Sequence, residues 1–128
     1  MIRVVVGILM NPQNKVLIAK RPAHKPYPGL WEFPGGKIEP DESGEAALKR
    51  ELQEELGIEV IGARNIVSHQ HVYPDKTVFL EVWLISMFSG EPQGLEGQAL
   101  RWVNASEIKD LRLLEGNWAI LERILTEI

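Results

Sequence analysis

Hydrophobic residues in the first part of the chain form two runs separated by a turn. Residues 4–10 are apolar at successive positions, so both faces of this segment are predicted to be buried, as in a central strand. Residues 11–14 are typical of a turn, and 15–20 form the predicted returning strand. Three prolines and one glycine in 21–29 indicate a loop, which leads to a short extended segment at 31–33.

The hydrophobic period lengthens to that of an α-helix between residues 43 and 56. Ser43 is suited to the N-cap of this helix, and Gly57 to the left-handed position after its last turn. The predicted buried stripe consists of Leu48, Leu52 and Leu56. Lys49 and Gln53 fall on the opposite side, which we expect to face solvent.

The second half of the chain is mainly strand-like. The predicted extended segments are 58–72, 77–88 and 99–103. We expect a break near Gly62, and Glu81 is expected to face solvent or to lie at a sheet edge. Ser106 is expected to cap one helical turn, and an amphipathic helix is predicted from about residue 117 to the end. Strands interspersed with helices favour an α/β fold, specifically an α/β/α sandwich with a mixed β-sheet between helices.

Composition narrows the possible functions. The 128 residues are expected to form a single domain, 1–128, because domains usually hold about 100–200 residues. The absence of cysteine excludes disulfides, cysteine zinc sites and thiol catalysis. The net charge of −4 disfavours a nucleic-acid polymer as partner, and a phosphate substrate would need cations. We recognise no membrane span or signal peptide, so we expect a cytoplasmic protein, and we infer no obligatory protein partner.

Three glutamates lie on one side of the predicted helix. At 100° per residue, Glu51, Glu54 and Glu55 fan over about 100° beside the buried stripe. A run of charged residues on a helix is usually a solvent-exposed face, with ion pairs between residues four positions apart. Two details favour a cation site instead. Glu51 and Glu55 are like charges one turn apart, which destabilises a helix unless a cation lies between them, and Ala47 is small enough to leave room for an ion. Carboxylates in this arrangement suit a hard divalent cation that completes its shell with phosphate oxygens.

The segment before the helix adds two glycines and two acidic residues. Gly35 and Gly36 permit close approach of the backbone, although a tight turn would also explain them. Glu39 and Glu42 could extend the anionic cluster or could simply stabilise the N-terminal end of the helix dipole.

A longer pattern runs through this loop and helix: Gly36-x5-Glu42-x7-Arg50-Glu51-Leu52-x-Glu54-Glu55-x-Gly57-Ile58. It resembles the Nudix box of the Nudix hydrolases at every specified position. Such a match arises by chance on the order of once in a million sequences of this length and composition. Segments 30–36, 90–92 and 96–98 are also similar to the MutT-type branch, which removes oxidised guanine nucleotides.

The resemblance implies a mechanism. Nudix enzymes hydrolyse a nucleoside diphosphate linked to another group, by attack of water on phosphorus with Mg²⁺ or Mn²⁺. The implied metal ligands are the Gly36 carbonyl and the carboxylates of Glu51, Glu54, Glu55 and Glu96. Arg50 would orient the glutamates, and Glu51 is the expected general base, with Glu96 as the alternative. In the MutT-type branch, attack at the β-phosphorus gives a nucleoside monophosphate and pyrophosphate.

The predicted substrate-binding residues are Arg21, Glu32, Phe33, Tyr73, Lys76 and Asn117, of which Asn117 stands where the MutT-type branch carries its base-reading asparagine. A side-chain amide such as that of Asn117 can donate to O6 and accept from N7–H of a guanine oxidised at C8, although a helix N-cap would also explain it. Phe33 and Tyr73 could wall the base or pack in the core. Arg21 could reach the α-phosphate, and Lys76 lies near the same site in the branch.

The expected substrate is therefore 8-oxo-dGTP, whose hydrolysis to 8-oxo-dGMP would protect the nucleotide pool from mutagenic precursors. Segments 40–43 and 68–70 also resemble relatives that act on pyrimidine triphosphates, and Glu115-Gly116 replaces the Pro-Ala common in the MutT-type branch. CTP, 5-methyl-dCTP or a broad range of nucleotides is the alternative. A Nudix module that senses nucleotides without cleaving them is disfavoured, because such modules typically lose box glutamates.

Overall fold

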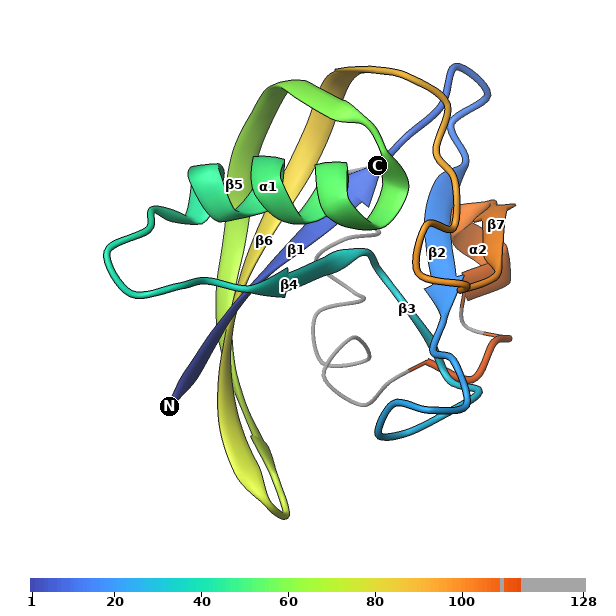
Figure 1. Cartoon of the computed structure of the whole chain (residues 1–128). Helices are drawn as coiled ribbons and strands as arrows, with labels where there is room; N and C mark the ends of the chain where they lie inside the picture. The colour runs from blue at the N-terminus through green and yellow to red at the C-terminus, as the bar shows by residue number, and fades with distance from the viewer. Residues whose placement is uncertain (109, 114–128) are drawn as a thin grey trace.

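The computed structural model describes residues 1–108 and 110–113, and this part of the chain forms two β-sheets (Figure 1). The first sheet has the order β4-β1-β6-β5, with the bounds Gly35–Lys37, Ile2–Leu9, Lys76–Ser89 and Glu59–Tyr73. Strand β1 runs parallel to β6, whereas the β4–β1 and β5–β6 pairs are antiparallel. The predicted α/β class with mixed strand directions is therefore confirmed.

The second sheet is smaller and entirely antiparallel. Its order is β3-β2-β7, with the bounds Trp31–Glu32, Val16–Lys20 and Leu100–Val103. The prediction of one sheet is therefore corrected to two. Strand β2 does not pair along β1, because β4 and β6 occupy both hydrogen-bonding edges of β1. An isolated bridge between Met10 and Val16 marks the point where the chain passes between the sheets.

Helix α1 (Gly44–Leu56) crosses one face of the first sheet (Figure 1). The Ser43 side chain accepts a hydrogen bond of 3.1 Å from the backbone N–H three residues ahead, and Gly57 adopts a left-handed conformation with φ of 70°. Both predicted caps are thus confirmed. Lys49 and Gln53 are exposed, as the helical period predicts.

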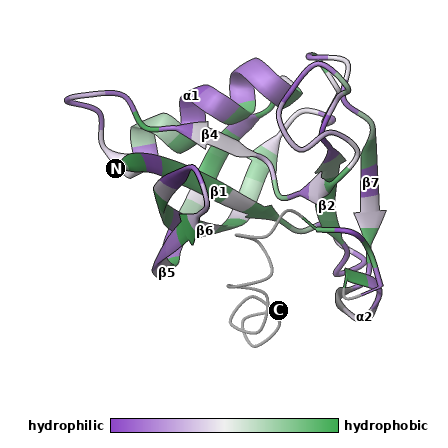
Figure 2. Cartoon of the chain, turned by 90° about the horizontal axis from the view of Figure 1, so that it is seen from below, coloured by the Kyte–Doolittle hydropathy of each residue, from purple (hydrophilic) through white to green (hydrophobic). Residues whose placement is uncertain are grey.

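The hydrophobic core occupies both faces of β1. Towards α1 it contains Val5, Leu9, Leu48, Leu52 and Leu56. Towards the second sheet it contains Val6, Ile8, Val16, Ile18 and Val103. Figure 2 shows hydrophobic residues along β1 and β6 and hydrophilic residues along α1. The predicted central position of the first strand is confirmed. Because both faces of β1 are buried, the strand lies between α1 on one side and the second sheet on the other.

Two local predictions differ from the structure. Strand β5 is continuous past Gly62, and the expected break takes the form of register shifts on either side of it. Helix α2 (Ala105–Ile108) begins one residue before Ser106. It is capped instead from Asn104, whose N–H donates to the Glu107 carboxylate at 3.0 Å while its carbonyl accepts from the Glu107 N–H at 2.9 Å.

Glu81 does not lie at a sheet edge, because β6 has a partner strand on each side. Its side chain is only 16% exposed and forms an ion pair of 2.9 Å with Arg3. The final helix expected from residue 117 lies outside the described residues. No helix within the described ranges has the length and apolar character needed to cross a bilayer.

Candidate active site

A cavity of about 640 Å³ lies between α1, β4 and the β5–β6 hairpin, and two loops complete its wall. Its volume is within the range of sites for small organic ligands. The acidic part of its lining consists of Glu32, Glu39, Glu51, Glu54, Glu55 and Glu96. The apolar part includes Val6, Phe33, Tyr73, Val78 and Leu80, which belong to the core cluster on the second-sheet side of β1. The cavity therefore combines a charged region with an aromatic and aliphatic one.

Arg50 organises the carboxylates along α1. Its guanidinium donates to both oxygens of Glu42, at 2.8 and 2.9 Å, and to Glu51 at 2.8 Å. It also donates to the Lys37 carbonyl at 3.0 Å and pairs with Glu54 at 3.5 Å. The hydrogen bonds from Arg50 lower the pKa of Glu42 to about 2. Glu42 thus anchors Arg50, and Arg50 in turn holds Glu51.

Gly36 brings strand β4 against Glu51. The strand is placed by antiparallel pairing of Gly36 with Val5. A Cβ atom at Gly36 would overlap the Glu51 carboxylate, so glycine is required for the backbone and the carboxylate to lie this close. The structure therefore brings together two of the residues that the sequence assigns to one site.

Glu55 has a carboxylate that is only partly compensated by its surroundings. Its Oε2 atom is buried and accepts no hydrogen bond from the described residues. Burial, together with the negative charges of Glu51 and Glu96, raises the pKa of Glu55 to about 8. Burial also raises the pKa of Glu51, against the opposing effect of its hydrogen bond from Arg50. A positive charge at this point would stabilise both ionised carboxylates.

Glu96 reaches the cavity from the loop after β6. Its carboxylate pairs with the Lys25 ammonium at 3.4 Å. Its backbone N–H donates to the Gln98 side chain at 2.9 Å, and that amide donates to the Glu55 carbonyl at 3.2 Å. The loop is thereby fastened to the end of α1, which explains how Glu96 comes to lie near Glu55.

Arg21 and Glu32 form an ion pair in the cavity wall. One guanidinium nitrogen donates to both Glu32 oxygens, at 3.0 and 3.2 Å, and Nε donates to the Pro26 carbonyl at 2.6 Å. Burial raises the pKa of Glu32, although the charge of Arg21 lowers it. Arg21 therefore supports loop 21–29 through these bonds. Its expected contact with the α-phosphate stays a prediction.

The remaining predicted substrate residues surround the apolar region. Phe33 and Tyr73 are 3% and 7% exposed and pack in the core, and both also line the cavity. Core packing is therefore confirmed for both rings, and contact with a nucleobase stays a prediction. The Lys76 ammonium lies 5.8 Å from the ring centroids of both Tyr27 and Tyr73. Asn117 lies outside the described residues.

A family model for the NUDIX domain matches residues 5–123. The chain belongs to the Nudix family. It is 42% identical over 121 residues to the CTP pyrophosphohydrolase of Escherichia coli K12, covering 94% of this chain and 90% of the relative. It is 39% identical over 103 residues to the 8-oxo-dGTP diphosphatase of the same strain, covering 80% of each chain.

A solved structure supports the same assignment. The solution structure of the Escherichia coli ORF135 protein matches with a TM-score of 0.87 and 41% identity, covering 98% of this chain and 89% of that one. The protein is thus a Nudix hydrolase that acts on a phosphoanhydride of a nucleotide.

The residues of this Nudix hydrolase fit the divalent cation that the family typically uses. Glu55 Oε2 has no hydrogen-bond partner among the described residues, and the Gly36 backbone lies against Glu51, so this part of the cavity offers oxygen donors of the kind that Mg²⁺ prefers. Within the described ranges, no three acidic or imidazole side chains already converge as a complete ligand set. Arg50 pairs with Glu51, and Lys25 pairs with Glu96, so either carboxylate would have to give up an ion pair in order to bind a metal.

Sequence reasoning missed two residues of this Nudix site, Lys25 and Tyr27. Lys25 pairs with Glu96, and the Tyr27 hydroxyl donates to Asp75 in the hairpin turn at 3.2 Å. Both stand in loop 21–29, outside any periodic pattern or box position, so the sequence offers no signal for them. The expectation for Ala47 is wrong, because this residue is fully buried in the core and its small size serves packing of α1.

Proposed function

We propose that this Nudix hydrolase is a nucleoside triphosphate pyrophosphohydrolase, which releases a nucleoside monophosphate and pyrophosphate. The observation that supports this most directly is a single cavity with carboxylates beside α1 and with Phe33 and Tyr73 in its apolar region. Carboxylates suit cation-bound phosphates, and aromatic rings suit a nucleobase. A nucleoside triphosphate presents both chemistries in one molecule.

The residues have distinct roles in this proposal. A bound Mg²⁺ or Mn²⁺ would neutralise phosphate charge and lower the pKa of a coordinated water. It would be held by the Gly36 carbonyl and the carboxylates of Glu51, Glu54, Glu55 and Glu96. Glu51 is our candidate for the general base that accepts the proton of the attacking water, because burial raises its pKa and Arg50 fixes its position. Glu96 is the alternative base. The attacked atom is the β-phosphorus.

Within this reaction, we propose 8-oxo-dGTP as the substrate. The support comes from the MutT-type segments 30–36 and 96–98, from Asn117, and from the 39% identical 8-oxo-dGTP diphosphatase. Hydrolysis of this nucleotide would remove an oxidised precursor before a polymerase incorporates it, and so would limit mutation.

CTP is the second candidate, together with 5-methyl-dCTP. The CTP pyrophosphohydrolase has the higher identity of the two relatives, and its match covers more of both chains. Segments 40–43 and 68–70 also resemble pyrimidine-specific relatives. A nucleotide panel separates the two candidates.

The test measures kcat/KM for 8-oxo-dGTP, dGTP, CTP and 5-methyl-dCTP with Mg²⁺, with products separated by chromatography. We expect 8-oxo-dGTP to exceed dGTP and the pyrimidines by roughly tenfold or more. A preference for CTP or 5-methyl-dCTP would replace the first candidate with the second. Failure of every nucleotide to yield a monophosphate and pyrophosphate would contradict the proposed reaction.

A further inference from the structure

Lys25 brings a positive charge into the acidic part of the cavity. Its ammonium lies 3.4 Å from the Glu96 carboxylate and lines the cavity from loop 21–29. Its charge also acts on Glu32 and Glu55, where it opposes the effect of burial on both pKa values. Lys25 therefore pairs with the Glu96 carboxylate, and its charge also acts on carboxylates from β3 and α1.

The two arginines of the cavity are bound more firmly than Lys25. Arg21 donates to Glu32 and to the Pro26 carbonyl, and Arg50 donates to Glu42 as well as to Glu51. Within the described ranges, the Lys25 side chain has one polar contact, the 3.4 Å pair with Glu96. Its side chain is 41% exposed, and such pairs are weak enough to exchange readily.

We propose that Lys25 is the counterion of Glu96 in the metal-free protein and binds substrate phosphate after a divalent cation has displaced it from that carboxylate. A cation bound between Glu55 and Glu96 would repel the ammonium at this distance. The displaced side chain still lines the cavity, where the phosphates then supply the negative charge. This inference rests on the proposed function, because it requires a phosphate-bearing substrate.

Removal of the Lys25 charge should therefore strengthen binding of the metal and weaken binding of the nucleoside triphosphate. In Lys25→Met, the nucleotide-free protein should bind Mn²⁺ about threefold to tenfold more tightly, because a competing positive charge is gone. The KM for the nucleoside triphosphate should rise about tenfold at saturating metal, because a charge-assisted contact to phosphate is lost. The kcat should stay within about twofold, since Lys25 does not touch the reacting water.

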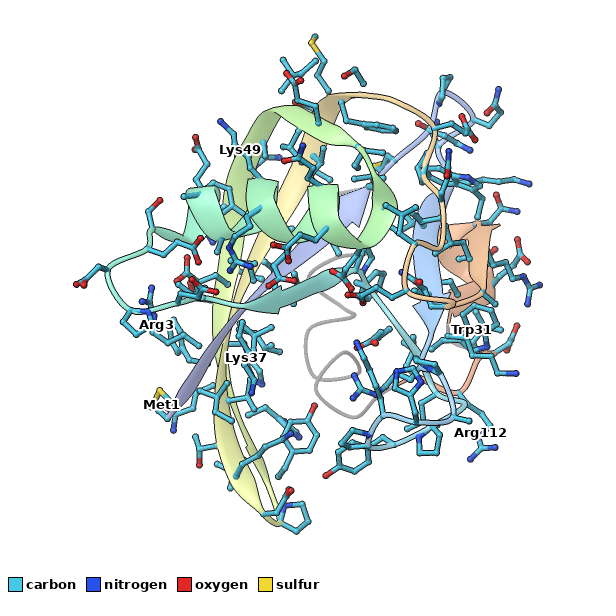
Figure 3. The ribbon with its side chains drawn as sticks, in the orientation of Figure 1. Met1, Arg3, Trp31, Lys37, Lys49 and Arg112 are labelled. Atoms are coloured by element: carbon cyan, nitrogen blue, oxygen red, sulfur yellow. The ribbon has the colours of Figure 1, made fainter. Side chains whose placement is uncertain are left out.

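Lys49 provides a matched control. Lys49→Met removes the same charge from an exposed residue that pairs with Glu45 at 3.5 Å, on the side of α1 away from Lys37 and the cavity (Figure 3). It should leave Mn²⁺ affinity and KM unchanged, which separates a local effect from a change in net charge. Lys25→Arg keeps the charge and should retain a KM close to that of the wild type.

The experiment is a calorimetric titration of Mn²⁺ into the nucleotide-free protein, paired with KM and kcat for the triphosphate that the wild type hydrolyses best. Tighter Mn²⁺ binding together with a raised KM, in Lys25→Met alone, supports the proposal. Unchanged or weaker Mn²⁺ binding, or an unchanged KM, overturns it. If thermal unfolding shows that Lys25→Met is misfolded, Lys25→Gln takes its place. The Mn²⁺ arm contains no nucleotide, so an error in substrate assignment does not affect it.

Discussion

At the residue scale, the cavity carboxylates differ in what neutralises them. Arg50 bonds to Glu51 at 2.8 Å, and Lys25 lies 3.4 Å from Glu96. Glu55 has a buried oxygen with no hydrogen-bond partner among the described residues. These differences support the proposed roles, in which Glu51 is positioned by Arg50 as metal ligand and base, and the Glu55 oxygen is available to a metal.

Glu51→Gln should preserve the fold and remove most turnover. Glutamine keeps the size of the side chain but loses the charge for a metal and the basicity for proton transfer. The loss of a general base alone typically lowers kcat by about 10²- to 10⁴-fold. Circular dichroism should show an unchanged fold while steady-state kinetics show the loss. A kcat within about threefold of the wild type would place the base elsewhere, with Glu96 as the next residue to test.

Substitutions at Asn117 distinguish a role in recognising the base from a role in capping a helix. If its amide reads an oxidised guanine, Asn117→Ala should lower kcat/KM for 8-oxo-dGTP by roughly 10- to 1000-fold and leave dGTP hydrolysis nearly unchanged, because each group left unpaired costs about 1–3 kcal/mol. If Asn117 is only an N-cap, Asn117→Ala should cost about 0.5–2 kcal/mol of stability, with constant selectivity. Asn117→Asp distinguishes the roles again, since aspartate caps helices but has no NH₂ for O6. Melting temperature and kcat/KM on both variants decide between them.

At the scale of elements, the site depends on how closely β4 lies against α1. The register of β4 on β1 sets Gly36 beside Val5, and α1 carries Glu51 to the same place. Arg50 connects the two elements, because it donates to the Lys37 carbonyl of β4 while it holds Glu51. The geometry of the carboxylates is therefore a property of the strand–helix pair.

Gly36→Ala should disturb this contact. The new methyl group would overlap the Glu51 carboxylate, which must then turn away from its position. We expect kcat/KM to fall by roughly tenfold or more, because misplacement of a catalytic group by about 1 Å can cost 10²-fold. Gly62→Ala is the control, because its methyl group would lie 3.2 Å from the Ser86 hydroxyl, in strands away from the cavity. Equal activity of the two variants would contradict the proposed role of this contact.

The raised pKa of Glu55 makes the stability of the metal-free protein depend on pH. The pKa of Glu55 is about 8 in the folded protein and has its ordinary value of 4.5 in the unfolded chain. Between pH 4.5 and pH 8, the folded protein therefore keeps a proton on Glu55 that the unfolded chain has released. Stability in the presence of a chelator should therefore fall as pH rises from about 5 towards 8. Mg²⁺ should restore more stability at pH 8 than at pH 6, because it replaces that proton.

Melting temperatures at both pH values, with chelator or Mg²⁺, test this expectation. Glu55→Gln should flatten the pH dependence of the metal-free protein, since glutamine does not titrate. A wild-type melting temperature that rises between pH 6 and pH 8 in chelator, by an amount that Glu55→Gln does not alter, would contradict the account.

At the scale of the whole molecule, the sequence predicts what depends on neighbours along the chain. The caps at Ser43 and Gly57 act within one turn, and the buried stripe of α1 follows from the helical period. The division into two sheets depends instead on which strands share hydrogen bonds across the fold, which hydrophobic patterns do not specify. For the same reason the pattern around Glu81 favours a solvent-facing or edge position, although this residue lies on an interior strand.

In the candidate site, too, some residues can be predicted from the sequence and others only from the folded chain. The box residues from Gly36 to Glu55 form a fixed pattern, so the sequence alone predicts that they share one site, and the structure brings Gly36, Arg50 and Glu51 together. Lys25 and Tyr27 enter the cavity through a proline-rich loop, and their neighbours Glu96 and Asp75 come from distant segments. Such contacts require the folded backbone, because loop residues have no periodic signal that indicates their direction.

The identity of the products tests the central claim most directly. Turnover of the preferred nucleoside triphosphate in Mg²⁺ should yield nucleoside monophosphate and pyrophosphate in equal amounts, as measured by chromatography and phosphorus NMR. Exhaustive chelation should abolish both products, because a substrate with about four negative charges meets a cavity lined by glutamates. Release of orthophosphate with a nucleoside diphosphate, or turnover that survives chelation, would contradict the account.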